Sequence, residues 1–263
     1  MADSSFLLIS DTNAVRWLTL NRPDVMNAVP HSGWAELRDA FRDFRSCDQR
    51  VLVVSGSGGN FCSGADVGEN DLAGTASSAA VGAAWMRPVG EAATELFHMP
   101  KPVIAMVDGV AAGAGLNLAL GCDVVIASEG ARFGEVFVRR GLTVDFGGTW
   151  LLPRLVGLAR AKEMALTGRL VDAHEALSIG LVSATVPVDS LRETVEEFAD
   201  ELTVGAPLAQ RFIKQGLNRS FEWSFEQAVA YETQAQATLL TSDDVAEGVR
   251  SFQEHRSPKF TGH

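Results

Sequence analysis

Three short, unbroken runs of apolar residues predict strands that are buried on both faces. They lie at 51–56 (VLVVSG), 102–109 (PVIAMVDG) and 123–128 (DVVIAS). Unbroken runs, rather than alternating ones, are typical of parallel strands covered by helices on both sides. The first two runs end in glycine and lead toward helix-like segments, and this alternation of strand, loop and helix is typical of an α/β layered domain. An earlier stretch, 7–21, has the polar punctuation of a β-hairpin.

Helical spacing of apolar residues predicts helices in the rest of the chain. The segment 31–46 repeats large apolar side chains at this spacing, which assigns them to the core. These side chains are Trp34, Leu37, Phe41 and Phe44. After Pro187 every segment has a helical pattern, and Ser242 with two following aspartates is a helix start. The segments are 189–202, 207–219, 224–240 and 242–255. We therefore predict an α/β core over residues 1–200 and a C-terminal helical region over 201–263.

Composition and charge exclude several classes of function. The chain has 263 residues, of which 46% are hydrophobic, so it can bury a sizeable core and is not a disordered chain. Its net charge of −11, without any cluster of Lys or Arg, argues against a nucleic-acid partner. The apolar stretch 103–127 is interrupted by Asp108, Asn117 and Asp123, which leaves less than the roughly 20 apolar residues that a membrane span needs.

Cysteine and histidine usage predicts neither a disulfide framework nor a metal site. The three cysteines are scattered and form no CxxC pair, and the five histidines are equally dispersed. We expect reduced thiols in a cytoplasmic protein, because no secretory leader is visible at the start of the sequence. The stretch 69–84 is rich in Ala, Ser and Gly. It is either a mobile loop or loosely held helix that forms a lid or pocket wall, or a plain surface loop.

Two glycine-rich turns are the first candidates for chemistry. They lie at 56–67 (GSGGNFCSGADV) and 109–119 (GVAAGAGLNLA), each after a predicted strand. Neither contains the lysine of a phosphate-binding P-loop or a full dinucleotide-binding fingerprint. What remains is two sets of backbone N–H groups that could hold one oxyanion. The alternative is that the glycines only allow a helix to pack closely against a strand.

An acidic residue in a third glycine-containing loop is the candidate base. Asp145 lies within GLTVDFGGTW (141–150), just before a predicted helix that Thr149 could cap. Its neighbours Val144 and Phe146 are apolar, and the desolvation they cause would raise the pKa of its carboxyl. Asp145 could equally be a turn or cap residue. Asp66 also lies in a glycine-rich turn, where it is better explained as the N-cap of the next helix.

Five segments together resemble the enoyl-CoA hydratase/isomerase (crotonase) family over nearly the whole chain. They are LNRPDVMNAV (20–29), GNFCSGADV (59–67), DGVAAGAGLNLALGCDVVIAS (108–128), FGGTWLLPRLVG (146–157) and FQEHRSPKF (252–260). The resemblance implies a crotonase-like α/β spiral of ββα units. It also implies C-terminal helices that join subunits into a homotrimer or a dimer of trimers. The implied substrate is an acyl-CoA thioester, with no separate cofactor because coenzyme A is part of the substrate.

The resemblance also implies where the substrate lies. The backbone N–H groups of Ala65 and Ala114 match the oxyanion hole that holds the thioester oxygen in this family. The tail of the chain is similar to one that lies near the site of a neighbouring subunit. The implied substrate-binding residues are Met26, Ala28, Ala65, Asp66, Val67, Gly68, Gly113, Ala114, Phe137, Lys259 and Phe260.

The departures from the family pattern bear on the reaction. The two glutamates that hydratases of this family use to split water match Asn117 and Phe137, and neither can transfer a proton in that role. Glu135 is two residues from the second position, and a helical turn there would aim it elsewhere, so we do not expect it to be a base. Asp145 matches the aspartate of isomerase members, in a context similar to epoxyphenylacetyl-CoA and enoyl-CoA isomerases.

These matches favour an enoyl-CoA isomerase in which Asp145 removes a proton and returns it two carbons away. Phe137 would then be an apolar wall that excludes water. Three alternatives stay open. One is a 2-enoyl-CoA hydratase, and another is a hydrolase or dehalogenase of an aromatic acyl-CoA with Asp145 as nucleophile, as in one branch of the family. The third is a non-catalytic acyl-CoA-binding protein, which would be favoured if Asp145 lay outside the acyl pocket.

Overall fold

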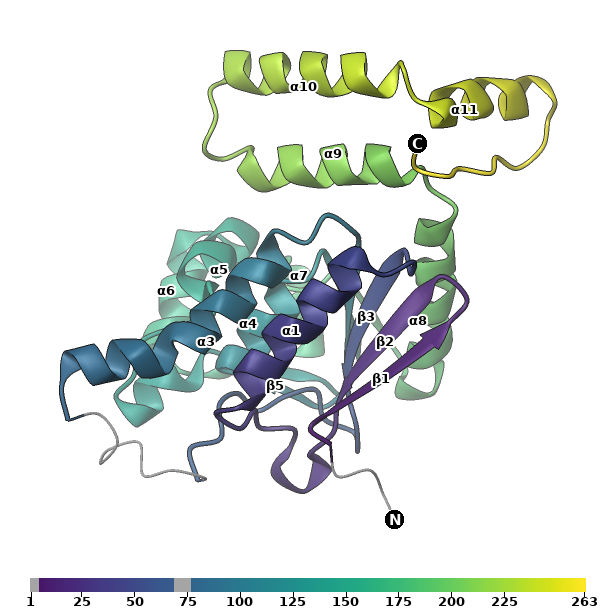
Figure 1. Ribbon diagram of the computed structural model, residues 1–263. Helices are drawn as coiled ribbons and strands as arrows, with labels where there is room; N and C mark the ends of the chain where they lie inside the picture. Colours follow the sequence, from purple (N-terminus) through teal and green to yellow (C-terminus); the bar gives the residue numbers. More distant parts are fainter. Residues whose placement is uncertain (1–4, 69–76) are drawn as a thin grey trace.

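A computed structural model describes residues 5–68 and 77–263 and shows an α/β body with helices extending from it (Figure 1). The main sheet has the strand order β1-β2-β3-β4-β6-β9, in which β1 and β2 form an antiparallel hairpin and the other neighbours are parallel. Its strands are β1 (Leu7–Thr12), β2 (Val15–Leu20), β3 (Val51–Gly56), β4 (Val103–Val107), β6 (Val124–Ser128) and β9 (Ala184–Val186). The predicted hairpin and the three predicted buried strands are confirmed.

Helices cover both faces of this sheet. One face packs on α1 (Gly33–Ser46) and α3 (Ala79–Phe97), and the other packs on α8 (Val188–Thr203). The four large apolar side chains predicted for the first helix are all buried: Trp34, Leu37, Phe41 and Phe44. The first part of the stretch 69–84 lies outside the described residues, while its end forms the first turn of α3.

A second, smaller sheet carries the loops that matter for function. It has the order β5-β7-β8, with β5 (Val110–Ala112), β7 (Arg132–Gly134) and β8 (Leu170–Asp172). The chain passes from β4 to β5 and then directly into α4 (Ala114–Leu120), which is a ββα unit. The remaining helices of the body are η1 (Pro23–Val25), η2 (Val136–Arg140), α5 (Gly148–Val156), α6 (Leu158–Thr167) and α7 (Ala173–Ser178). The predicted α/β spiral of ββα units is confirmed.

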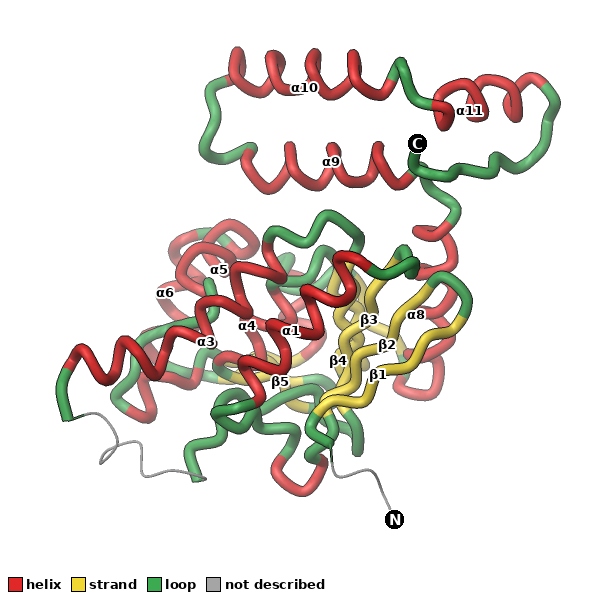
Figure 2. Tube along the Cα trace, viewed as in Figure 1, coloured by secondary structure: helices red, strands yellow, loops and turns green. Residues whose placement is uncertain are grey.

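The C-terminal helices form a separate layer beside the α/β body and are bonded to it through the first of them (Figures 1 and 2). They are α9 (Pro207–Arg219), α10 (Phe225–Leu239) and α11 (Asp243–Gln253), close to the predicted bounds. The predicted start of the last helix is confirmed, because the Ser242 hydroxyl accepts a hydrogen bond from the Val245 amide. Lys214 of α9 ties this region to the body through Asp123, at 2.6 Å. The boundary at residue 200 falls inside α8 and stays a prediction.

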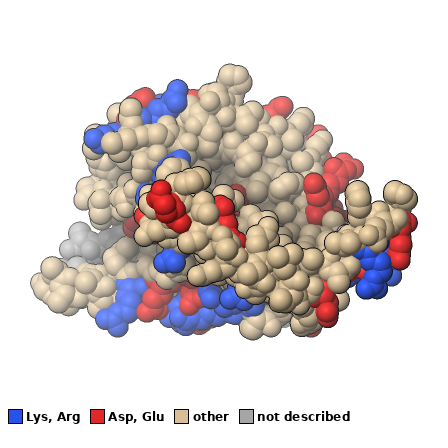
Figure 3. Space-filling model, turned by 90° about the horizontal axis from the view of Figure 1, so that it is seen from above, with Lys and Arg blue, Asp and Glu red and all other residues tan. Residues whose placement is uncertain are grey.

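Large apolar side chains are exposed on the C-terminal helices and on the segments that join them. They include Ile213, Leu217, Phe221, Phe225, Leu240, Val249 and Phe252. Seen from above, much of the molecular surface is uncharged, and many of its acidic and basic side chains lie toward the edges (Figure 3). Exposed apolar area of this kind marks an interaction surface rather than a solvated face. In the described part of the chain, no helix is both long and apolar enough to cross a membrane.

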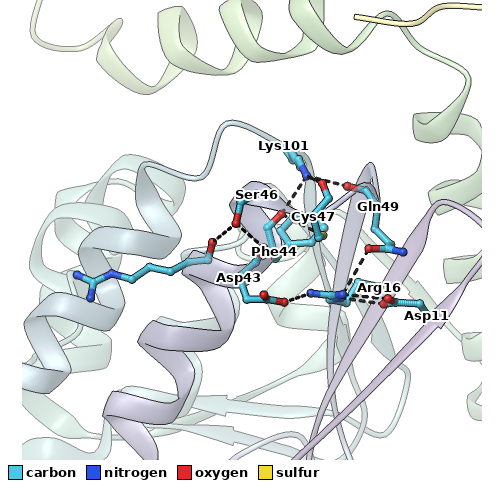
Figure 4. A network of polar contacts seen from close by, with 9 residues as sticks. Asp11, Arg16, Asp43, Phe44, Ser46, Cys47, Gln49 and Lys101 are labelled. Carbon is cyan, nitrogen blue, oxygen red and sulfur yellow. Dashed lines mark hydrogen bonds and ion pairs between the residues drawn. The ribbon is translucent and has the colours of Figure 1, made fainter.

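A network of polar contacts fixes the end of α1 against the sheet (Figure 4). The Lys101 ammonium group donates hydrogen bonds to the carbonyl oxygens of Phe44, Cys47 and Gln49, at 2.6–2.9 Å. Arg16 of β2 pairs with Asp11 at 2.8 Å and also with Asp43 of α1. Each of these positively charged side chains therefore donates hydrogen bonds to carboxylate or carbonyl oxygens. The cysteine thiols are free, as predicted.

Candidate active site

The two glycine-rich turns lie side by side. The Cys62 amide donates to the Val110 carbonyl and the Cys62 carbonyl accepts from the Ala112 amide, both at 2.9 Å. Gly64 lies so close to the second turn that a Cβ atom there would be 2.9 Å from the Ala112 carbonyl oxygen. Its φ of +100° also requires glycine. Glycine is therefore required at this position, because a side chain would prevent the two backbones from approaching so closely.

This approach brings the amides of Ala65 and Ala114 to the same place. A Cβ atom on Gly64 would lie 3.4 Å from the Ala114 nitrogen, so the two turns are in contact directly beside both amides. Among the hydrogen bonds of the described residues, neither amide has an acceptor. Gly113 has a φ of +55° and donates to the Gly134 carbonyl at 2.8 Å, which fixes the peptide just before Ala114. Two unpaired, fixed N–H groups of this kind can stabilise an oxyanion.

A cavity of about 530 Å³ opens over these amides. Its lining includes most of the residues expected to bind substrate: Met26, Ala28, Ala65, Asp66, Val67, Gly113, Ala114 and Phe137. Arg139, Arg140 and Leu142 also line it and were not expected from the sequence. Gly68 is not among the lining residues, and its amide donates to Asp66 at 3.0 Å.

One rim of the cavity is held by an ion pair. Arg22 donates to the Asp66 carboxylate at 2.8 Å and to the Ala28 carbonyl oxygen at 2.9 Å. It thereby connects the loop that contains Met26 to the first glycine-rich turn. The role of Asp66 as a helix N-cap stays a prediction, since the segment after Gly68 lies outside the described residues.

Asp145 lies in a strained turn next to α4. The Asp145 carbonyl accepts from the Asn117 side chain at 3.0 Å and from the Gly148 amide at 2.9 Å. Phe146 has a φ of +48°, a left-handed conformation that is rare for a bulky residue. Its ring is buried and lies 5.5 Å from the ring of Trp34, centroid to centroid. The packing of Phe146 therefore holds the backbone that presents Asp145.

The structure corrects the expected helix cap in this loop. Thr149 does not cap α5, because the helix begins at Gly148 and Gly147 is its N-cap. Gly147 has a φ of +81° and no side chain with which to cap. The left-handed turn at Phe146 and Gly147 starts the helix earlier than the position of Thr149 indicated.

A second carboxyl lies beside Asp145. Glu135 follows β7 directly and is fully buried, and one of its oxygens accepts from the Asn117 amide at 3.4 Å. The electrostatic effect of Asp145 and, above all, burial raise the pKa of Glu135 to about 8. Burial alone raises the pKa of Asp145 to about 6. Glu135 was not expected to be a base, yet the structure places it in one cluster with Asn117 and Asp145.

The carboxyl of Asp145 is not among the groups that line the cavity. The backbone carbonyl of Asp145, not its carboxyl, is bonded to Asn117, which lies on α4 three residues after Ala114. Phe137 is buried, lines the cavity and lies next to Gly113, and its role as an apolar wall stays a prediction.

The C-terminal tail lies elsewhere in the same chain. The Lys259 amide donates to Glu247 of α11 at 2.9 Å, and the Phe260 ring lies beside Gly248. Neither residue lines the cavity over Ala65 and Ala114. The contact of this tail with the site of a neighbouring subunit stays a prediction. Within the described residues, no group of three or more His, Cys, Asp or Glu side chains is placed to hold a metal ion.

Comparisons with known proteins give the same relationship along the whole chain. Residues 10–263 match the family model described as enoyl-CoA hydratase/isomerase. The 1,2-epoxyphenylacetyl-CoA isomerase of Escherichia coli (strain K12) is 36% identical over 98% of both chains. The (E)-benzylidenesuccinyl-CoA hydratase of Thauera aromatica is 34% identical over 95% of this chain and 97% of that protein. The crystal structure of an enoyl-CoA hydratase from Bacillus anthracis has a TM-score of 0.92 at 31% identity, covering 98% of this chain and all of that one.

Proposed function

The chain belongs to the enoyl-CoA hydratase/isomerase family of acyl-CoA enzymes, and from this premise we propose that it is an enoyl-CoA isomerase with Asp145 as its base. The observation that carries the proposal is the placement of the half-buried Asp145 against Asn117 of α4, the helix that begins at the unpaired Ala114 amide. Burial also raises the pKa of the Asp145 carboxyl to about 6. A carboxyl with a pKa of about 6 is ionised at neutral pH and is more basic than an exposed one.

The identity of the neighbouring residues supports isomerisation over hydration. The positions that match the two water-splitting glutamates of hydratases hold Asn117 and Phe137. Asn117 uses its amide to fix the Asp145 carbonyl, and Phe137 is a buried aromatic ring. Neither side chain can remove a proton from water.

The proposed reaction moves one proton across an allylic system. The Asp145 carboxylate takes a proton from the carbon between the thioester and the double bond, and the electron pair of the broken C–H bond passes to the thioester oxygen. The amides of Ala65 and Ala114 stabilise the resulting enolate. Asp145 then returns the same proton two carbons away, which forms the conjugated double bond and restores the carboxylate.

The charges at the cavity fit a coenzyme A thioester. Arg139 and Arg140 line it and are exposed, so their guanidinium groups can pair with phosphates. We propose no further cofactor, since both proton steps use Asp145. The exposed apolar residues of α9–α11 support assembly as a homotrimer or a dimer of trimers.

An absorbance assay with two substrates tests the proposal. Purified protein is incubated with 3-hexenoyl-CoA and, separately, with 2-hexenoyl-CoA, and each reaction is repeated with Asp145→Asn. The isomerase produces conjugated-enoyl absorbance from the 3-enoyl substrate, and the variant does not. Loss of absorbance from the 2-enoyl substrate would instead show hydration and overturn the proposal.

One observation favours a second candidate, a non-catalytic acyl-CoA-binding protein. Asp145 is not among the cavity-lining residues, so an acyl group confined to that cavity would not meet it. The same assay separates the two functions. A binder gives no absorbance change with either thioester, while equilibrium dialysis still detects bound acyl-CoA.

A further inference from the structure

The cluster behind the oxyanion site contains more hydrogen-bond acceptors than donors. Asn117, Glu135 and Asp145 each have one buried side-chain oxygen without a hydrogen-bond partner: Oδ1, Oε1 and Oδ1. Buried polar atoms are nearly always paired, because an unpaired one costs about 1–3 kcal/mol. Three such atoms within one cluster therefore need an explanation.

The orientation of Asn117 is fixed by its neighbours. Its Nδ2 atom donates to the backbone carbonyl of Asp145 at 3.0 Å, and a carbonyl can only accept. The same Nδ2 atom donates to Glu135 Oε2 at 3.4 Å. Turning the amide over would place its oxygen against these two oxygens, so Asn117 Oδ1 must remain an acceptor.

We propose that Glu135 is a neutral carboxylic acid that donates a hydrogen bond to this cluster, so that Glu135 and Asp145 together hold one proton and one negative charge. A proton on Glu135 Oε1 turns one unpaired acceptor into a donor. The remaining orphan acceptors of the cluster are Asp145 Oδ1 and Asn117 Oδ1, so one proton donated to either would pair two of the three orphan atoms. Without this proton, two carboxylates would share one buried site, which is strongly unfavourable.

The electrostatics of the described residues agree with a single charge. The charged group that acts on Glu135 is Asp145, from the loop before α5. No Lys or Arg of the described residues offsets the charge of either carboxyl. Burial raises the pKa of both carboxyls, and Glu135 is the more deeply buried of the two, which favours the proton on Glu135.

The neutral state of Glu135 has a consequence for the enolate. This inference deepens the proposed function and rests on it only for catalysis. The enolate is an anion, and one carboxylate beside it suffices to remove the proton. Ionisation of Glu135 would add a second negative charge and oppose formation of the enolate. Glu135 is thus a positioning residue that sets the alkaline limit of activity, and it need not touch substrate.

The first test does not depend on activity. Infrared difference spectra of the ligand-free protein labelled with ¹³C-glutamate are recorded from pH 5 to pH 10. We expect a protonated glutamic acid band at pH 7 that titrates near pH 8 and is lost in Glu135→Gln. The exposed Glu193 of α8 supplies the control variant, Glu193→Gln, which keeps the band. A band that persists in Glu135→Gln, or none in the wild-type protein at pH 7, would overturn the proposal.

A second variant, Asp145→Asn, tests the proposal even if Glu135→Gln does not fold. In Asp145→Asn the like charge is removed, so the titration of Glu135 must move to lower pH. An unchanged midpoint overturns the coupling. In the active enzyme, Glu135→Gln keeps the rise in kcat near pH 6 and loses the fall near pH 8, whereas a merely structural role lowers kcat at every pH. If the infrared result holds and no isomerase activity is found, the proposed function fails and the shared proton stands.

Discussion

Two partly buried polar clusters in this chain are built on opposite principles. At the end of α1, the positively charged side chains of Arg16 and Lys101 donate hydrogen bonds to carboxylate and carbonyl oxygens, so donors and acceptors are paired. Next to α4, Glu135 and Asp145 have the same charge sign and three oxygens lack partners. The first cluster lowers the energy of the fold, and the second raises it. Unsatisfied, like-charged carboxyls of this kind make the second cluster, and not the first, the candidate for chemistry.

The largest effect is expected from removing the base. Asp145→Asn should lower isomerase kcat by roughly 10²- to 10⁴-fold, because the amide cannot accept the substrate proton. Its stability should be unchanged or higher at pH 8, since the buried charge is gone. Stopped-flow absorbance and urea unfolding measure the two quantities. A variant with wild-type kcat would show that this cluster is not catalytic.

The next effect is expected from separating the two glycine-rich turns. A methyl group in Gly64→Ala would meet the Ala112 carbonyl at 2.9 Å and displace the amides of Ala65 and Ala114. We expect kcat to fall about 10²- to 10³-fold, in line with loss of an oxyanion donor. Gly180→Ala is the control, with a similar positive φ of +76° but no place in the site. Equal kcat in both variants would contradict the role of these amides.

The satisfied cluster should respond in stability rather than rate. Lys101→Met leaves three carbonyl oxygens without their shared donor, which should cost about 1–3 kcal/mol of unfolding free energy. Activity per folded molecule should remain, because none of these groups lines the cavity. Urea titration beside a kcat measurement separates the two effects. A loss of kcat without a loss of stability would reverse the distinction between the clusters.

The smallest effect concerns the dependence of stability on pH. The pKa of Glu135 is raised in the folded state, from 4.5 to about 8, so folding favours its protonated form. The wild-type protein therefore loses stability relative to Glu135→Gln as pH rises between these values. We expect the variant to gain at least about 1 kcal/mol at pH 8.5 and little at pH 4.5. Parallel stability curves for the two proteins would be inconsistent with a raised pKa.

The regular parts of this fold could be predicted from the sequence because their patterns are local. Trp34, Leu37, Phe41 and Phe44 repeat at helical spacing, and the structure buries all four. The apolar runs at 51–56 and 123–128 are strands, as unbroken runs of that length predict. Neither result required knowledge of which segments lie together.

The candidate site could be predicted only in part, because its geometry depends on where elements end. The orientation of Glu135 follows from β7 stopping at Gly134 and η2 starting at Val136, a boundary that no spacing rule fixes. Thr149 was wrong as a cap because Phe146 adopts a left-handed conformation, which a bulky residue rarely does. Arg139 and Arg140 carried a signal, two adjacent positive residues before a glycine, but nothing local placed them at a cavity.

The contact between the two glycine-rich turns also orders events during folding. Ala65 and Ala114 are about fifty residues apart, and the hydrogen bonds of Cys62 that join their segments close that long loop. Closing it costs chain entropy before any contact compensates, so this bridge forms slowly compared with the local helices. A refolding chain can thus regain α1 and the β1–β2 hairpin, whose contacts are local, while the two amides are still apart. Such an intermediate has native local structure, and its two amides cannot yet act together on one oxyanion.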